Sequence, residues 1–268
     1  MKIVVNERVQ ELPGEAPVPA GAVRDRFKPD ADLIIVDGFP ANPETPVSNG
    51  QSVCLIRRGE IPPPEELEYL MMARHTPGVH EKVRRATVGI AGLGGLGSSV
   101  AVALARIGIG ALILADFDVV EPSNLNRQQY FLDQIGLPKT KALSDTLSRI
   151  NPGVRLYTHQ VLLTPGNIPE IFADADILVE AFDRPDQKAM LADTWLSRFP
   201  GRPLVCASGL AGFDDANLIR SRPFGPMIIV GDGTAEARQG VGLMAPRVGV
   251  AAHHQANAVL QLILRRQE

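Results

Sequence analysis

The sequence predicts an α/β protein with a doubly wound, mostly parallel sheet, preceded by a small β-rich module. Three observations predict it. From residue 86 onward, apolar strand-like segments alternate with helical segments. A glycine-rich turn joins the first of these strands to its helix. Before residue 60, short apolar strands are instead separated by turns rich in proline and glycine.

Residues 1–60 have the pattern of a separate domain. Three segments read as short strands, KIVVN, ADLIIVD and QSVCLIRR, and residues 19–28 have room for one short helix. Three consecutive prolines at 62–64 then predict a stiff connector, because proline continues neither strand nor helix. A helix is predicted over 65–75, so residues 61–85 are interpreted as a linker and helix.

Residues 86–268 are predicted to form the larger domain. Its strands are expected at Thr87–Ala91, Ala111–Ala115, Arg155–Thr158, Ile177–Ala181 and Leu204–Ala207. Helices are expected around 96–108, 138–150 and 185–198, with a long terminal helix from Ala245 to Arg266. Between 209 and 241 a glycine-rich span has room for a short antiparallel pair. Alternation at this spacing predicts helices on both faces of the sheet and right-handed crossovers.

Composition excludes several classes of protein. With 27 basic and 30 acidic residues the net charge is −3, which argues against broad nucleic-acid binding. The sequence contains no run of the roughly 20 apolar residues that a membrane helix needs. Charges interrupt the N-terminal apolar run, so no secretory signal is predicted and a cytoplasmic protein is expected. The two cysteines form no CxxC motif, which excludes a four-cysteine zinc site.

The segment VGIAGLGGLGSSV carries the first chemical motif. Gly92, Gly94 and Gly97 fit G-x-G-x-x-G between a strand and a helix, and Gly95 lies within the same turn. The first glycine permits the tight turn, the second lets phosphate oxygens approach the backbone, and the third lets helix and strand pack closely. Asp116 follows Gly97 by 19 residues, where an acceptor for a ribose hydroxyl is expected. The motif fits NAD, FAD and ATP alike.

Charged residues further along favour a triphosphate. Arg127 follows the second strand, and Lys139 begins the next helix in GLPKTKA. A nicotinamide cofactor needs few cations beyond the helix terminus, whereas a triphosphate needs several. Asp183 comes directly after the strand that ends in VEAF, at the sheet edge where ligands bind. A carboxylate there is a natural ligand for Mg²⁺ held by phosphates.

These motifs together resemble the ThiF/MoeB/HesA superfamily, which is related to ubiquitin-activating enzymes. The resemblance rests on GLGGLGSS, DFDVVEPSNLNRQ, GLPKTKA, the aspartate after VEAF, and GLMAPRVGVAAHHQA, over about residues 65–268. It implies a Rossmann-like adenylyltransferase that uses Mg-ATP. Such enzymes activate the C-terminal glycine carboxylate of a small ubiquitin-like sulfur carrier and release pyrophosphate.

The resemblance also implies roles for individual residues. The nucleotide is expected to be held by Gly92, Gly94, Gly95, Gly97, Asp116, Asp118, Asn124 and Gln128. Arg127 and Lys139 are expected to act on the phosphates, and Asp183 to hold Mg²⁺. Family members complete the site with an arginine from the partner subunit of a homodimer, and Arg74 is the candidate here.

Two features depart from the family pattern. Many relatives carry four zinc-binding cysteines and a further cysteine in a crossover loop, and this sequence has neither. Sulfur transfer is therefore expected to use another protein. Residues 1–58 resemble ThiS-like β-grasp carriers, yet the chain continues through Arg57-Arg58-Gly59-Glu60 in place of a free Gly-Gly terminus. The module is thus either a stabilising accessory domain or a domain that occupies or shapes the surface on which the carrier docks.

The sequence and its resemblance to this family therefore predict an adenylyltransferase for a ThiS-like carrier in thiamine thiazole biosynthesis, without zinc, nucleic acid or membrane partners. Three alternatives stay open. One is a related enzyme that acts on a molybdopterin carrier or a tRNA-linked carboxylate. Another is an NAD-dependent oxidoreductase, which leaves Arg127, Lys139 and Asp183 without a role. The last is a scaffold whose nucleotide site is purely structural.

Overall fold

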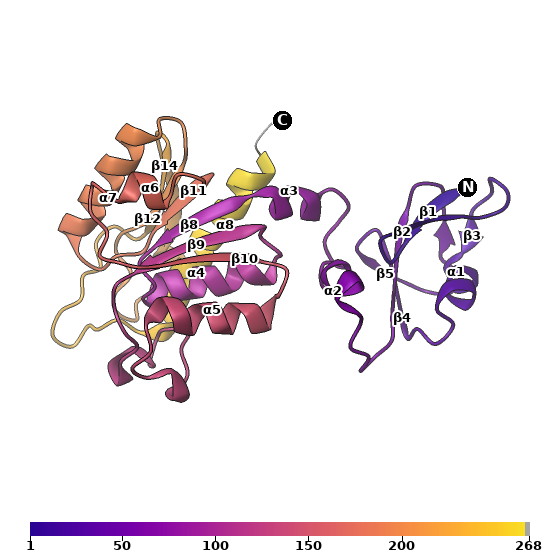
Figure 1. Ribbon diagram of the computed structural model, residues 1–268, viewed down its shortest axis with the longest axis horizontal. Coiled ribbons are helices and arrows are strands. Elements are labelled where there is room, and N and C mark those ends of the chain that lie inside the picture. Colours follow the sequence, from indigo (N-terminus) through magenta and orange to yellow (C-terminus); the bar gives the residue numbers. More distant parts are fainter. Residues whose placement is uncertain (266–268) are drawn as a thin grey trace. The chain divides into compact units, whose positions relative to one another are not determined.

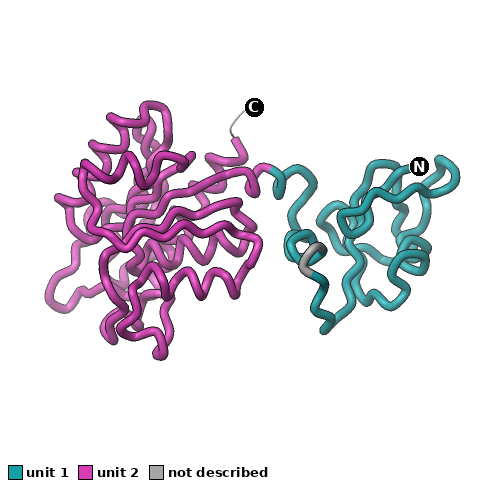
Figure 2. The backbone as a smooth tube through the Cα atoms, viewed as in Figure 1, with its two compact units in different colours: residues 1–81 teal, residues 82–268 magenta. Residues whose placement is uncertain are grey.

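The structure is a computed structural model that describes residues 1–265, without the side chains of residues 64 and 65. The chain forms two compact units, Met1–Glu81 and Lys82–Glu268 (Figure 2). Each unit contains a sheet of its own. Within the described residues, none of the helices is long and apolar enough to cross a bilayer.

Unit 1 is built on a five-stranded sheet in the order β2-β1-β7-β4-β5. Its strands are β1 (Lys2–Val5), β2 (Arg8–Glu11), β4 (Leu33–Val36), β5 (Phe39–Ala41) and β7 (Ser52–Ile56). The central strands β1 and β7 are parallel, and antiparallel neighbours flank them on both sides. Helix α1 (Ala20–Phe27) and a short ladder of β3 (Val18–Pro19) with β6 (Pro46–Val47) complete the unit. This topology confirms the predicted β-grasp module.

Alternating residues of this sheet build two separate apolar layers. Val53 and Leu55 belong to the main core with residues of α1. Their neighbour Cys54 points to the opposite face, because successive strand residues alternate. There it packs with Ile35 and with Tyr69 of α2 (Pro64–Met71). The helix predicted over 65–75 thus ends at Met71 and covers unit 1, and α3 (Val79–Arg85) follows it.

Unit 2 is built on a seven-stranded sheet in the order β10-β9-β8-β11-β12-β14-β13. Its strands are β8 (Thr87–Ala91), β9 (Ala111–Asp116), β10 (Arg155–Gln160), β11 (Ile177–Glu180), β12 (Leu204–Ala207), β13 (Arg220–Phe224) and β14 (Met227–Gly231). Only the edge strand β13 runs antiparallel to its neighbour. The predicted mostly parallel sheet and its antiparallel pair are confirmed.

Helices cover both faces of this sheet (Figure 1). On one face α4 (Gly95–Arg106) packs beside α5 (Lys139–Ile150) and α8 (Ala245–Arg265). On the other, α6 (Ile168–Ile171) packs with α7 (Pro185–Arg198) around Phe172 and Trp195. Helix α4 ends two residues before the predicted boundary at 108, where Gly108 adopts a φ of +75° that suits glycine.

The strand order reverses between β8 and β11. From β8 the chain winds through β9 to β10 at one edge, and then returns to place β11 on the other side of β8. Such a switch point leaves a crevice outside the carboxyl ends of the two strands, where ligands of this fold class bind. The glycine loop follows β8 and Asp183 follows β11, so both predicted motifs lie at this edge.

Candidate active site

The glycine loop is close-packed against the protein at two positions and open at a third. Gly92 has a φ of +88°, and a Cβ there would lie 3.0 Å from the carbonyl oxygen of Ala181. A Cβ at Gly97 would lie 1.9 Å from the carbonyl oxygen of Gly92. At Gly94 the nearest atom to a Cβ is Nε2 of Gln128, 3.8 Å away. Gly94 therefore leaves the free space into which a phosphate can come.

Side chains fix this loop through the backbone of Leu93. The Leu93 N–H donates to Oδ2 of Asp116 at 2.6 Å, and the Tyr130 hydroxyl donates to the Leu93 carbonyl at 2.8 Å. Oδ1 of Asp116 accepts from the Asp118 N–H at 2.8 Å. Burial raises the pKa of Asp116 above its ordinary value, although these backbone donors and Lys139 oppose the shift. Asp116 keeps lone pairs with which to accept a ribose hydroxyl.

Lys139 and Asp118 form an ion pair beside the loop. The Lys139 Nζ lies 3.0 Å from Oδ2 of Asp118, and the lysine side chain is only 7% exposed. Its backbone N–H also donates to the Asp118 carbonyl at 3.0 Å. Lys139 begins α5, because Pro138 before it has the extended conformation that a helix start accepts. The structure thus brings together Asp116, Asp118 and Lys139.

Arg127 and Asn124 lie on the segment that crosses the start of α4. Oδ1 of Asn124 accepts from the Glu121 N–H at 3.1 Å and so closes a 3₁₀ turn, Pro122–Asn124. Nη1 of Arg127 donates to the Ser123 carbonyl at 3.0 Å and to Oδ1 of Asn126 at 2.9 Å. The arginine stem passes over Gly95, where a Cβ would lie 3.5 Å from the Arg127 Cγ.

Gln128 presents a buried atom that lacks a partner. Its side chain is 8% exposed, and Oε1 accepts no hydrogen bond within the described residues. Unpaired buried oxygens are rare in native proteins because they lose their hydration without compensation. This amide lies next to Gly94. A ligand bound at the open side of the loop is therefore in a position to donate a hydrogen bond to Oε1 of Gln128.

Asp183 lies exposed in the turn between β11 and α7. The described residues contain no group of three or more His, Cys, Asp or Glu side chains arranged to hold a metal ion. A single carboxylate nevertheless fits Mg²⁺, which proteins bind through one or two carboxylates together with substrate phosphates and waters. Arg74 belongs to unit 1, where it is exposed between α2 and α3.

Two polar networks near the site are absent from the sequence prediction. Arg247, 3% exposed at the start of α8, donates to the carbonyls of Asp214 and Asp215 and to Oδ2 of Asp232, at 2.6, 3.1 and 2.5 Å. It thereby anchors the segment after β12. The second network joins Glu180, at the end of β11, with Lys188 of α7. In the sequence, Glu180 could have been recognised because it is an acidic residue at the end of an otherwise apolar strand, ILVE.

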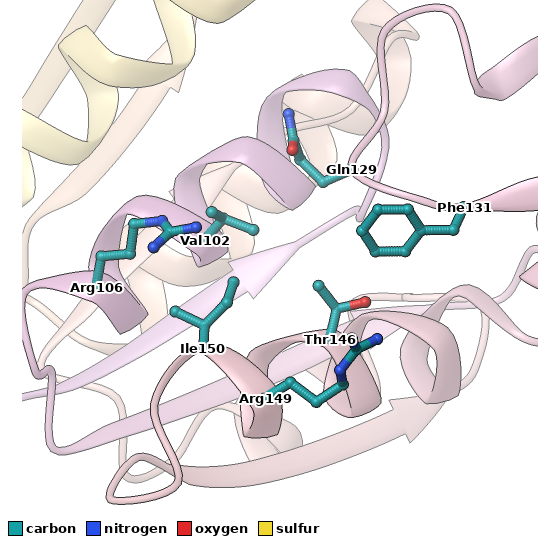
Figure 3. Close-up of a pocket in the computed structure, with 7 residues that line it drawn as sticks. All are labelled: Val102, Arg106, Gln129, Phe131, Thr146, Arg149 and Ile150. Carbon is teal, nitrogen blue, oxygen red and sulfur yellow. The ribbon is translucent and has the colours of Figure 1, made fainter. Parts of the chain in front are cut away.

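A hollow of the described residues lies apart from the glycine loop. It occupies about 280 Å³ between α4 and α5 (Figure 3). Its lining residues are Val102, Arg106, Gln129, Phe131, Thr146, Arg149 and Ile150. None of them is a predicted site residue. The sheet edge at the switch point, where Asp116, Asp118 and Lys139 come together beside the glycine loop, is the better candidate for chemistry.

A doubly wound sheet with an open glycine loop, a buried acid after β9 and a lysine beside that acid is the arrangement typical of nucleotide-binding proteins. Residues 68–268 match the model of the ThiF family, and residues 1–59 match the ThiS-like ubiquitin model. The chain belongs to the ThiF family.

Relatives by sequence include proteins named adenylyltransferase and sulfurtransferase uba4. The one from Emericella nidulans is 39% identical over 130 residues, which cover 48% of this chain and 27% of that protein. The one from Eremothecium gossypii is 32% identical over 68% of this chain and 42% of its own length. Ubiquitin-like modifier-activating enzyme 5 of Caenorhabditis elegans is 44% identical over 35% of this chain and 23% of its own length. The chain thus spans between about a quarter and two fifths of the length of these curated relatives.

Solved structures show the same fold. The E. coli tRNA N6-threonylcarbamoyladenosine dehydratase TcdA, in complex with ATP, has a TM-score of 0.66 at 24% identity, covering 72% of this chain and 92% of that one. E. coli MccB, solved with MccA-N7isoASN, has a TM-score of 0.55 at 26% identity, covering 71% and 59%.

Proposed function

We propose that this protein is an ATP-dependent adenylyltransferase that activates the C-terminal carboxylate of a ubiquitin-like carrier protein. The observation that carries the proposal is the combination of open space at Gly94 with the charged residues at the same sheet edge, namely Arg127, Lys139 and Asp183. The names of the relatives, adenylyltransferase and sulfurtransferase uba4 and ubiquitin-like modifier-activating enzyme 5, support it, as does the ATP in the TcdA structure.

The proposed reaction needs charge stabilisation more than proton transfer. A carboxylate oxygen of the carrier attacks the α-phosphorus of ATP, the bond between the α-phosphorus and its bridging oxygen breaks, and pyrophosphate leaves. The carboxylate is already ionised at pH 7, so no general base is required. The barrier comes from bringing one anion to another, which fixed cations and unpaired helix N–H groups lower.

Each predicted residue has a place in this scheme. The loop at Gly92, Gly94, Gly95 and Gly97 gives the phosphates access to the start of α4. Arg127 holds phosphate oxygens through its remaining N–H groups, and Lys139, paired with Asp118, adds a second positive charge. Asp116 accepts the ribose hydroxyl, with Asn124 shaping the turn and Gln128 contacting the nucleotide. Asp183 holds Mg²⁺, which when bound neutralises phosphate charge.

Neither cysteine is suited to a covalent second step. Burial raises the pKa of the Cys206 thiol to about 12, with the nearby Glu180 charge adding to the shift. Burial also raises the pKa of Cys54, which lies in the second apolar layer of unit 1, beneath α2. The thiolate is the nucleophilic form, so transfer of sulfur is assigned to another protein.

Unit 1 is proposed to assist the enzyme and not to serve as its substrate. Its tail is held against the unit: Nη1 of Arg57 lies 3.0 Å from Asp30, and the Arg58 N–H donates to Asp32 at 2.7 Å. A substrate tail has to extend freely into an active site. The proposed division is residues 1–60 as accessory module, 61–85 as connector and 86–268 as enzyme.

The carrier is proposed to be a ThiS-like protein that ends in Gly-Gly, as in thiamine thiazole formation. The ThiS-like module at the front of this chain supports that choice. The protein is further proposed to act as a homodimer in which Arg74 reaches the partner's phosphates, an arrangement that the resemblance to the family suggests.

Carrier-dependent exchange of labelled pyrophosphate into ATP tests the proposal, with several Gly-Gly-ended carriers. Arg127→Ala and Asp183→Ala are each expected to lower exchange at least ~100-fold while remaining folded, because each removes fixed charge from the phosphates. Asp193→Asn, an exposed acid on α7, is the matched control and is expected to retain full exchange. Full exchange in Asp183→Ala would remove the metal assignment, and tight NAD binding without ATP binding would replace the proposal with an oxidoreductase.

A further inference from the structure

A buried ion pair lies beside the turn that carries Asp183. Glu180, the last residue of β11, is 1% exposed, and Lys188 of α7 lies 2.9 and 3.0 Å from its two carboxylate oxygens. The same Nζ donates to the Ala207 carbonyl at the end of β12, at 3.0 Å. Stability alone is a poor explanation for such a pair, because an apolar pair of similar size often stabilises a protein as well or better.

The Glu180 carboxylate accepts from two backbone amides as well as from Lys188, and the weaker of these bonds joins the Ala207 N–H to Oε2 at 3.5 Å. Its Oε1 accepts from the Phe182 N–H at 2.7 Å. The Ala181 N–H, one residue earlier, donates to the Ala91 carbonyl of β8 at 2.9 Å. Two successive amides of the turn are therefore fixed, one by the neighbouring strand and one by Glu180. Asp183 is the next residue along the chain.

The glycine loop confines the same turn from another side. A Cβ at Gly92 would lie 3.0 Å from both the Ala181 carbonyl oxygen and Cδ1 of Phe182. A Cβ at Gly97 would lie 3.2 Å from the Ala181 Cβ. The turn thus fits between the loop and the ion pair with little freedom. Any shift of Phe182 moves Asp183 relative to the loop.

We propose that Glu180 is a positioning residue: held by Lys188, its carboxylate anchors the Phe182 amide and so sets Asp183 at a fixed distance from the glycine loop. The proposal rests on the proposed function in one respect, that Asp183 serves the nucleotide phosphates. Burial raises the pKa of Glu180 while the Lys188 charge opposes the shift, which agrees with an anchor that needs its cation nearby.

Two double variants separate the effect of the hydrogen bond to the Phe182 amide from the effect of the Glu180–Lys188 charges. Glu180→Gln with Lys188→Met removes both charges but keeps a side-chain oxygen for the Phe182 amide. Glu180→Leu with Lys188→Met removes the oxygen as well. Neither leaves an unpaired buried charge, so both are expected to fold. Asp193→Asn, on the same helix as Lys188 but exposed, controls for a change of charge on α7.

The first measurement is pyrophosphate exchange over a range of ATP concentrations up to saturation. The Gln/Met variant is expected to keep kcat within about threefold, and the Leu/Met variant to lose at least ~10-fold, because misplacing a reacting group by about 1 Å costs rate and not affinity. KM for ATP is expected to stay within about threefold in both. If Glu180 had only a structural role, the Leu/Met variant would have a lower melting temperature, but it would not lose kcat at an unchanged KM for ATP.

The second measurement is hydrogen exchange at the Phe182 amide, which needs neither ATP nor carrier. Protection is expected to fall roughly 100-fold in the Leu/Met variant and to be retained in the Gln/Met variant. Equal protection and equal kcat in the two variants would overturn the proposal. If the unchanged protein showed no pyrophosphate exchange, the proposed function would be wrong. Hydrogen exchange at the Phe182 amide would then test by itself whether Glu180 anchors that amide.

Discussion

At the scale of single residues, the glycine loop is constrained by distances that no side chain satisfies. Gly97→Ala is expected to destabilise the protein by about 1–3 kcal/mol and to weaken ATP binding, because its Cβ would lie 1.9 Å from the Gly92 carbonyl oxygen. Urea unfolding and ATP titration measure the two effects.

Gly249→Ala provides the matched control in α8. A Cβ there meets no atom within 4 Å, so alanine is expected to raise stability by about 0.5–1 kcal/mol through the lost freedom of the unfolded chain. Equal stability changes at Gly97 and Gly249 would contradict the close packing of the loop.

Cys206 offers a test of the chemistry assigned to the cysteines. With a pKa of about 12 against an ordinary 9.0, its thiolate fraction at pH 8 is on the order of a thousandfold below that of an unperturbed thiol. Alkylation by iodoacetamide at pH 8 is therefore expected to be slower by at least that factor, and to rise tenfold per pH unit up to about pH 11. Rapid labelling of Cys206 in the folded protein would reopen a cysteine-dependent step.

At the scale of elements, α7 depends on one aromatic anchor. Trp195 is fully buried, its ring centroid lies 4.6 Å from that of Phe199, and its N–H faces the carbonyls of Arg202 and Pro203 at 3.3 Å each. Trp195→Ala is expected to cost about 3–5 kcal/mol, and Trp195→Phe clearly less, in urea unfolding followed by circular dichroism. Equal losses would mean that the indole volume is unimportant.

The elements also show what the sequence can and cannot predict. Strands β8 and β12 are placed at their observed bounds because short apolar runs end at glycine, serine or acid residues. The positions of the loop, Asp116 and Asp183 in the fold are predictable because each lies at or just after the end of such a strand, and that of Lys139 because it follows a proline at a helix start. The Glu180–Lys188 pair is not, because its partners are eight residues apart and Lys188 has the pattern of a solvated helix face. The short β3–β6 ladder depends equally on contacts between distant residues.

At the scale of the whole molecule, separate cores predict separate responses to mutation. Leu55 is fully buried in the core of unit 1. Leu55→Ala is expected to destabilise that unit by about 2–5 kcal/mol. The only tryptophan of the sequence, Trp195, belongs to unit 2, so its fluorescence reports the unfolding of that unit.

The fluorescence transition is expected to keep its midpoint in Leu55→Ala, while circular dichroism gains an earlier phase. A common shift of both signals would show that the two units unfold as one cooperative body. Trp195→Phe is the reverse test. It is expected to destabilise unit 2 and to leave the stability of unit 1 unchanged.

The backbone of Leu93 carries a final consequence. Both of its polar groups are engaged by side chains of the protein itself, the N–H by Asp116 and the carbonyl by Tyr130. These two hydrogen bonds hold the loop backbone in one conformation. Binding of a triphosphate therefore costs little conformational entropy for ordering the loop. Binding calorimetry at several temperatures is expected to give a heat-capacity change that reflects only the surface covered by the nucleotide, with no added contribution from ordering of the loop.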